Sequence, residues 1–172
     1  MHLRPLDPSD AQAMLDLRLR NREHFLTGEP LRPDSWFTLD AQRRALETAE
    51  QERAAGTREL FGIIVADDQI AGYVSLSQIF RGAFQSCYLG YAIDRERSGE
   101  GLGTAAVAAA VEHAWEIGLH RVQANVIPTN TGSRRVLEKN GFRHEGTALR
   151  YLHIGDRWAD HDMFAKTVEE RG

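Results

Sequence analysis

One segment of the chain combines the residue types and the spacing needed to bind a phosphate group. Ser98-Gly99-Glu100-Gly101-Leu102-Gly103-Thr104 lies between an extended apolar run and a long alanine-rich run. In a strand-to-helix loop of this kind, successive backbone N–H groups and the helix N-terminus can surround an anion, and glycine lets that anion approach the backbone closely. The simpler alternative is a tight connection with no ligand, because glycines often serve that purpose alone.

Two other phosphate-binding loops are excluded by the details of this segment. It lacks the Gly-Lys-Ser/Thr ending of the nucleotide triphosphatases. It also comes late in the chain, whereas a dinucleotide-binding fold places its glycines after the first strand. From these residues alone, a phosphate site of another kind and a tight connection without a ligand both stay open.

A second segment follows about 30 residues later. Asn130 precedes Ser133 by three residues, and residues 136–142 read Val-Leu-Glu-Lys-Asn-Gly-Phe. Asparagine is a good helix cap, and Asn140-Gly141 is a typical left-handed helix stop before a strand. Taken alone, this segment requires only a short helix between two strands.

The periodicity of apolar residues predicts the elements that position both segments. Asp7-Pro8-Ser9-Asp10 is a strong helix start, and residues 20–36, with Gly28, Pro30 and Pro33, are expected to form an irregular loop. We expect strands at 2–6, 60–65, 70–76, 86–93 and 121–127, a terminal hairpin of 142–153 with 157–168, and helices ending near Leu19 and at 39–55, 102–115 and 133–139.

These elements predict the fold class and the domain organisation. They make an α/β (α+β) domain with a mixed, mostly antiparallel twisted sheet of about seven strands and about four helices. A chain of 172 residues with 42% hydrophobic content can bury a sizeable core, so residues 1–172 are expected to form a single domain. The single cysteine, Cys87, reads as a core residue. The charged, proline-containing N-terminus has no apolar signal core, so we expect a cytoplasmic protein without a membrane segment.

The charge and the histidine pattern restrict the partners. A formal charge of -4 and a pI near 6.0 argue against direct nucleic-acid binding, which normally uses a basic face. They do not exclude a basic protein tail as a partner. The 7 histidines show no paired spacing of the zinc type, so no metal is expected.

Together the two segments resemble the GCN5-related N-acetyltransferase (GNAT) superfamily, whose coenzyme A loop reads Gln/Arg-x-x-Gly-x-Gly/Ala after the fourth strand. Gly101 and Gly103 match that motif, and Asn130-x-x-Ser133 matches the later family segment. The resemblance implies the GNAT fold and acetyl-coenzyme A as the co-substrate. It assigns cofactor binding to Tyr91, Ala92, Ile93, Ser98, Gly99, Glu100, Gly101, Leu102, Gly103, Thr104, Asn130 and Ser133.

Two positions of the glycine loop depart from the family pattern. Ser98 stands where glutamine or arginine is usual, and Glu100 stands where a basic residue is common. Because backbone donors carry most of the phosphate binding, we expect the site to survive. Glu100 is then expected to turn to solvent, and Arg95 or Arg97 to supply the missing charge.

Within the superfamily the chain is most similar to the RimJ-type enzymes, which acetylate the N-terminal alanine of a ribosomal protein. The similar segments are 87–91, 120–125, 140–146 and 155–161. The resemblance implies a protein N-terminus as the acceptor, with a ribosomal protein as the partner. Fold alone does not determine function, so a small-molecule amine acceptor and a non-catalytic coenzyme A-binding regulator stay open as alternatives.

The catalytic candidates follow from the same resemblance. Leu137 occupies the position at which many members carry an acidic tyrosine, so Ser133 becomes the candidate acid, with helix capping as its alternative role. Backbone N–H groups of a bulged fourth strand near Tyr91 and Ala92 are the expected oxyanion donors. Glu145 is a candidate base, as are Asp160 and His161, and Phe25, Trp36 and Tyr151 are candidate walls for a small first residue.

Overall fold

The computed structural model describes residues 1–26 and 28–171, and within them one seven-stranded sheet carries α-helices on both faces. The strand order is β1-β2-β3-β4-β5-β7-β6, and only the β4–β5 pair is parallel. This arrangement confirms the predicted class and the mixed, mostly antiparallel sheet. The strands are β1 (His2–Pro5), β2 (Glu59–Ile64), β3 (Ile70–Phe80), β4 (Ser86–Ile93), β5 (Arg121–Val126), β6 (Arg143–Ile154) and β7 (Arg157–Thr167), and the helices are α1 (Ala11–Arg20), α2 (Arg22–Phe25), α3 (Leu39–Ala54), α4 (Leu102–Glu116) and α5 (Thr131–Lys139).

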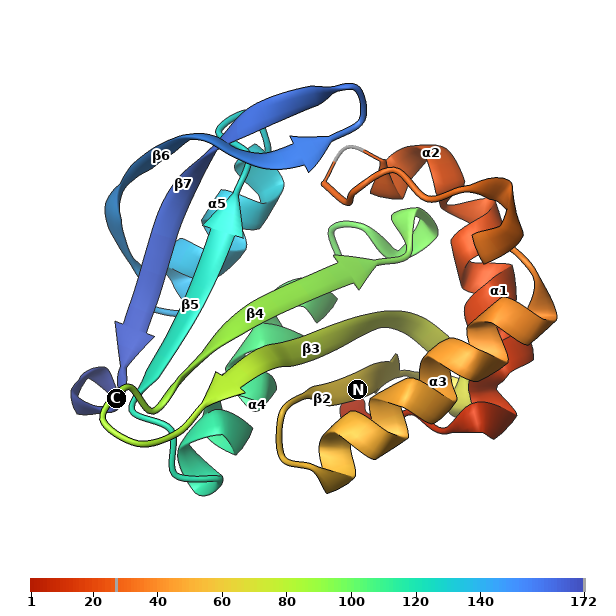
Figure 1. Cartoon of the computed structure of the whole chain (residues 1–172), viewed down its shortest axis with the longest axis horizontal. Coiled ribbons are helices and arrows are strands. Elements are labelled where there is room, and N and C mark those ends of the chain that lie inside the picture. Colours follow the sequence, from red (N-terminus) through yellow and green to blue (C-terminus); the bar gives the residue numbers. More distant parts are fainter. Residues whose placement is uncertain (27, 172) are drawn as a thin grey trace.

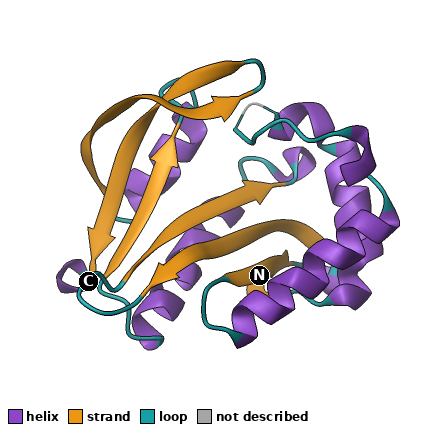
Figure 2. Ribbon diagram, in the orientation of Figure 1, coloured by secondary structure: helices purple, strands orange, loops and turns teal. Residues whose placement is uncertain are grey.

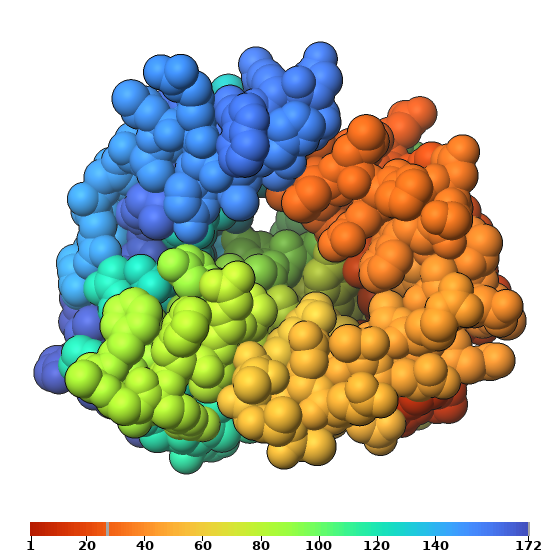
Figure 3. Space-filling model, in the orientation of Figure 1, coloured from red at the N-terminus to blue at the C-terminus, as the bar shows by residue number. Residues whose placement is uncertain are grey.

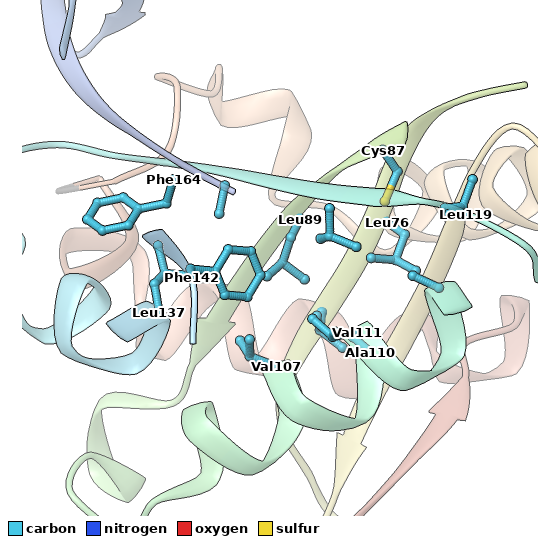
Figure 4. Packing of buried hydrophobic residues seen from close by; sticks show 14 of the residues in the cluster. Leu76, Cys87, Leu89, Val107, Ala110, Val111, Leu119, Leu137, Phe142 and Phe164 are labelled. Carbon is cyan, nitrogen blue, oxygen red and sulfur yellow. The ribbon is translucent and has the colours of Figure 1, made fainter. Parts of the chain in front are cut away.

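The helices divide between the two faces of the sheet (Figures 1 and 2). Because side chains alternate along a strand, Phe61 of β2 enters the hydrophobic cluster under α4, whereas Leu60 enters the cluster under α1 and α3. Figure 4 shows Val107, Ala110 and Val111 of α4 packed toward the sheet. Small alanines on that helix face allow this close approach.

The predicted loop of residues 20–36 contains regular structure among its described residues, and Thr27 lies outside the residues that the structure describes. The loop contains the short helix α2 and a 3-10 turn at Asp34–Trp36. A single helical turn is too short to show a hydrophobic period, and the signals from Gly28 and Pro30 dominate the local sequence. Helix α2 is the reason that the described residues contain five α-helices where about four were predicted.

Two further predictions concern Cys87 and membrane-spanning helices. Cys87 is fully buried among core residues, which confirms its predicted role, and burial raises the pKa of its thiol to about 12. No helix within residues 1–26 and 28–171 is long and apolar enough to cross a membrane.

The parallel pair is the feature that opens the sheet. β4 and β5 are paired only from Ser86 with Arg121 to Tyr88 with Gln123. Beyond Tyr88 the two strands separate, while β4 continues beside β3 and β5 continues beside β7. The rest of β4 therefore has one free edge, which faces the gap between the strands (Figure 1).

Candidate functional site

A cleft of about 840 Å³ occupies the gap between β4 and β5. Figure 3 shows a hollow at this place, between the β6–β7 hairpin and the segment that holds α2. The glycine loop, the start of α4 and α5 form one wall, which we call the loop wall. The rest of the lining, which we call the hairpin wall, includes Tyr73, the β7 residue His161 and, from the α1–α2 region, Arg18, His24, Phe25, Gly28, Glu29, Pro30 and Arg32.

The N-terminus of α4 is the strongest anion-binding feature of the loop wall. Gly101 adopts a left-handed conformation with φ of 79°, and no side chain caps the helix. The N–H groups of the first helical turn have no intrahelical acceptor, so those of Gly103 and Thr104 point outward without a cap. By contrast, Thr38 caps α3 and Asn130 caps α5. Open space surrounds the Cα of Gly99 and of Gly101, which leaves room for a phosphate.

The free edge of β4 supplies further donors. The N–H of Asp94 donates to the Ala71 carbonyl of β3 at 2.8 Å. Because backbone groups alternate along a strand, the N–H of Ala92 also points to β3, and that of Tyr91 points into the cleft. The expected bulge at this point is wrong: the β3–β4 register is continuous from Gly72 to Ser77, and its shift lies beyond Ser77. Strand divergence, not a bulge, exposes the edge.

Two candidate catalytic side chains meet in the cleft. The Tyr91 hydroxyl lies 2.8 Å from the Ser133 hydroxyl, and it also donates to the Ser133 carbonyl at 3.3 Å. Burial raises the pKa of Tyr91 to about 12, against a smaller lowering by Ser133, so the phenol is neutral at pH 7. Ser133 is not the helix cap, because its N–H donates to the Asn130 side chain at 3.0 Å. Its hydroxyl is therefore available for other contacts.

Leu137 cannot act as an acid, because its hydrocarbon side chain has no proton to transfer, and it is fully buried in the core. An added Cβ at Gly103 would lie 3.5 Å from Ile93 and from Val136, which is ordinary van der Waals contact, so the packing of α4 does not require glycine at this position.

Cations surround the loop wall. Arg97 lines the cleft and lies 3.6 Å from Glu100, whose side chain is exposed outside the cleft. Arg95 does not line it. Arg135 and Lys139 of α5, which the sequence reading missed, also line the cleft. Their i,i+4 spacing places them on one helix face, and that spacing was a readable signal.

The hairpin wall contains a charged group that the sequence reading also missed. The Tyr73 hydroxyl donates to Glu29, and Arg18 pairs with the same carboxylate at 3.4 Å. Burial, with Glu29 as the next cause, raises the pKa of Tyr73. Of the predicted aromatic wall only Phe25 lines the cleft, where its ring meets that of Tyr73 edge-on.

The remaining two aromatic candidates lie elsewhere. Trp36 lies outside the cleft, in a separate shallow pocket with Arg44 and Thr48. Tyr151 lies behind His161, with ring centroids 5.6 Å apart.

The three predicted base candidates are separated by the structure. His161 lines the cleft and is 2% exposed. Asp160 points outward, where it accepts a hydrogen bond from the backbone of Arg150. Glu145 is exposed outside the cleft and pairs with Arg121 and Arg143, and the hydrogen bond from Arg121 lowers its pKa. The structure therefore does not bring Glu145 to the other candidates.

Most of the predicted cofactor residues do come together. The cleft is lined by Tyr91, Ala92, Ile93, Ser98, Gly99, Gly101, Leu102, Gly103, Thr104, Asn130 and Ser133, and Glu100 is the exception.

Comparison with known proteins places this architecture. A family model described as an acetyltransferase (GNAT) domain matches residues 1–143. The probable N-acetyltransferase YjcK of Bacillus subtilis is 42% identical over 168 residues, which cover 96% of the chain and 92% of that protein. The [ribosomal protein uS5]-alanine N-acetyltransferase of Escherichia coli is 32% identical over 163 residues, covering 94% and 84%.

A solved structure shows the same similarity in three dimensions. Mycobacterium smegmatis RimJ in complex with CoA-disulfide matches with a TM-score of 0.93 at 33% identity, over 98% of the chain and 82% of that structure. The similarity thus spans nearly the whole chain in both sequence and fold.

Proposed function

This chain belongs to the GNAT family and is an N-acetyltransferase, and from that premise we propose that it acetylates the α-amino group of a protein N-terminus. The donor in this proposal is acetyl-CoA, and the acceptor is an N-terminal alanine, with a small-subunit ribosomal protein as the partner. Support for the acceptor comes from the relatives that carry the alanine N-acetyltransferase name at 32% identity.

The loop wall carries the kinds of groups that bind the phosphates of the donor. Uncapped N–H groups of Gly103 and Thr104 and the cations Arg97, Arg135 and Lys139 would hold its phosphates. The bound donor supplies an acetyl thioester, whose reactive carbon would lie beside the free edge of β4. The solved structure of Mycobacterium smegmatis RimJ, at 33% identity, is a complex with CoA-disulfide, which supports the same assignment.

The charge of the cleft is the observation that carries the acceptor class. Among the described residues that line it are six Arg and Lys side chains (Arg18, Arg32, Arg58, Arg97, Arg135 and Lys139) and a single carboxylate, Glu29. Arg18 and Tyr73 already occupy that carboxylate. The donor's phosphates would neutralise Arg97, Arg135 and Lys139, which leaves Arg18, Arg32 and Arg58 among the lining cations. A polyamine would bring several positive charges to these three side chains and meet no unpaired carboxylate, so repulsion disfavours it. A peptide N-terminus brings one amine.

The chemistry of an α-amine also suits this site. Its reference pKa is about 8, so a useful fraction is neutral near pH 7, whereas a lysine amine with a reference pKa of about 10.4 is almost wholly protonated. In the proposed reaction the Tyr91 N–H stabilises the developing oxyanion. The Ser133 hydroxyl gives its proton to the departing thiolate and regains one from the Tyr91 hydroxyl, which exchanges with water.

A competition among acceptors tests the proposal. We would compare peptides that differ only in a first residue of Ala, Ser, Met or Phe with an N-terminally blocked lysine peptide and with spermidine, and follow thiol release. The alanine peptide should give the highest kcat/KM. Faster turnover of spermidine or of the blocked lysine peptide would remove the N-terminal assignment, and no thiol release with any amine would favour a non-catalytic regulator.

A further inference from the structure

His161 is held in one orientation on the hairpin wall. Its Nδ1 lies 3.1 Å from the Ala159 carbonyl oxygen, which can only accept, so Nδ1 carries the proton. In a neutral imidazole the lone pair is then on Nε2. Nε2 forms no hydrogen bond or ion pair with any described residue. It is also not one of the buried polar atoms that lack a partner, so this nitrogen is accessible. A residue that is 2% exposed therefore directs a free basic nitrogen toward the cleft that it lines.

An irregularity of the neighbouring strand supports this position. The β6–β7 register shifts between Ala148 and Leu152, and Arg150 takes a positive φ of 49° within the shift. The Arg150 N–H donates to the Asp160 carboxylate at 2.7 Å, which ties the bulge to β7 directly before His161. Bulges and positive-φ residues are enriched beside functional sites, where they redirect a side chain.

Tyr151 directly follows Arg150 in this bulge. Its ring lies against His161, and its hydroxyl accepts a hydrogen bond from the Asn125 side chain of β5 at 3.1 Å. The imidazole is thus packed on one side and bonded at Nδ1, and only Nε2 remains for a ligand. Asp160, which the sequence suggested as a base, instead accepts the Arg150 N–H and holds the bulge in place.

Other basic groups in the cleft are less available. The Glu29 carboxylate is bound by Arg18 and Tyr73. The guanidinium and ammonium groups of the cleft are donors only. His24 also lines the cleft, but it is exposed. Among the described residues that line the cleft, His161 alone combines burial, a determined tautomer and an open basic atom.

We propose that His161 is the general base of the acetyl transfer, which rests on the proposed function. As the acceptor nitrogen attacks the thioester carbon and the N–C bond forms, one N–H proton passes to Nε2. The C–S bond then breaks, and the sulfur takes its proton from Ser133. His161 returns its proton to water, so one proton has moved from nitrogen to sulfur overall.

A set of variants separates this role from a structural one. His161→Asn keeps a side-chain N–H that can reach the Ala159 carbonyl, but it removes the base. We expect kcat to fall about 100-fold, the typical value for loss of a general base, with the acceptor KM and the acetyl-CoA affinity unchanged. His161→Ala leaves space for an imidazole, and added imidazole should restore at least about tenfold of the lost rate.

The matched control is His153→Asn, an exposed histidine of the same hairpin that stacks on Trp158 outside the cleft. It should keep the wild-type kcat. Retention of wild-type kcat in folded His161→Asn, an equal loss in His153→Asn, or no imidazole rescue of folded His161→Ala would each overturn the proposal. The assays use whichever amine the wild-type protein acetylates fastest, so a wrong acceptor assignment would appear in that choice and not in the His161 comparison.

Discussion

The two walls of the cleft are built in different ways. The loop wall consists mainly of one continuous segment, from the end of β4 through the glycine loop into α4, and backbone groups carry its chemistry. The hairpin wall combines Tyr73 of β3, Glu29 beyond α2 and His161 of β7, and side chains carry its chemistry. These residues are up to about 130 positions apart in the chain.

This difference explains why the donor can be assigned with more detail than the acceptor. A backbone cradle needs only glycines and a helix start, and many sequences can satisfy that need in the same way. A wall of side chains depends on how three separate elements meet, so it can change while the fold is kept. We therefore expect variants of the loop wall to affect donor binding and variants of the hairpin wall to affect the acceptor step.

The largest expected effect is on the loop wall. Gly101→Asp places a carboxylate at the uncapped start of α4, where the phosphate would lie. We predict that acetyl-CoA binding falls by at least about 100-fold, because the new charge repels the phosphate and competes for the same N–H groups. Isothermal titration calorimetry measures the affinity.

Gly118→Asp is its control. Gly118 has a φ of 82°, close to the 79° of Gly101, and open space around its Cα, but it follows the other end of α4. Both variants suffer similar backbone strain, so a comparable loss of affinity in both would show that strain, and not the phosphate site, is responsible.

The next effect concerns the hydroxyl pair of Tyr91 and Ser133, which joins β4 to α5. Ser133→Ala removes the candidate acid and leaves the Asn130 cap intact, because the cap uses the Ser133 backbone. We predict that kcat falls by about 100-fold while acetyl-CoA affinity is kept. If Tyr91→Phe acts through the same hydroxyl, the double variant should be no slower than the slower single variant.

Thr131→Ala provides the comparison for this prediction, since Thr131 is exposed in the same helical turn outside the cleft. A slow Thr131→Ala enzyme would point to a disturbed helix and not to a lost acid.

A smaller effect is predicted where the two walls are joined. Asp94, at the end of β4, accepts hydrogen bonds from Arg20 at 2.7 Å and from Asn21 at 3.1 Å. Burial alone would raise the pKa of Asp94, but the bonds from Arg20 and Asn21 outweigh it and lower the pKa. Asp94→Asn should reduce the free energy of unfolding by about 1–3 kcal/mol at pH 7, because Arg20 loses its charged partner.

The pH dependence has a definite sign. A carboxyl group with a lowered folded-state pKa stabilises the protein above its unfolded value, about 3.9, and this contribution disappears as the pH falls through the folded-state pKa. Urea unfolding at pH 7, 5, 4 and 3 should therefore show the gap between wild type and Asp94→Asn closing in acid. A gap that is constant with pH would show that the charge of Asp94 is not the cause.

The smallest effect tests the bulge of the hairpin wall. Arg150 is exposed and has a positive φ of 49°, a conformation that glycine adopts without strain. Arg150→Gly should raise the free energy of unfolding by about 0.5 kcal/mol, since relief of strain slightly exceeds the entropy that glycine adds to the unfolded chain. Thermal and urea unfolding measure it. Arg150→Ala keeps the strain, and an equal gain there would exclude strain as the cause.

The sequence by itself determined the elements whose information is local. The helix start at Asp7, the asparagine cap at Asn130 and the glycines of the cofactor loop depend on neighbouring residues, and capping bonds at Asp7 and Asn130 agree with these readings. The hydrophobic periods predicted the strands, and through them the sheet. The four-residue helix α2 escaped prediction because one turn carries no period.

Only the tertiary structure decided which side chains share the cleft. Glu145 and His161 are both polar residues of the last two strands. In the β6–β7 pairing, which shifts register at Glu145 and again around Arg150, Glu145 lies in a surface ion pair and His161 lies in the cleft. Divergence of β4 from β5 exposes the Tyr91 N–H without the expected bulge. Register and strand divergence depend on contacts between distant segments, so the local sequence did not contain them.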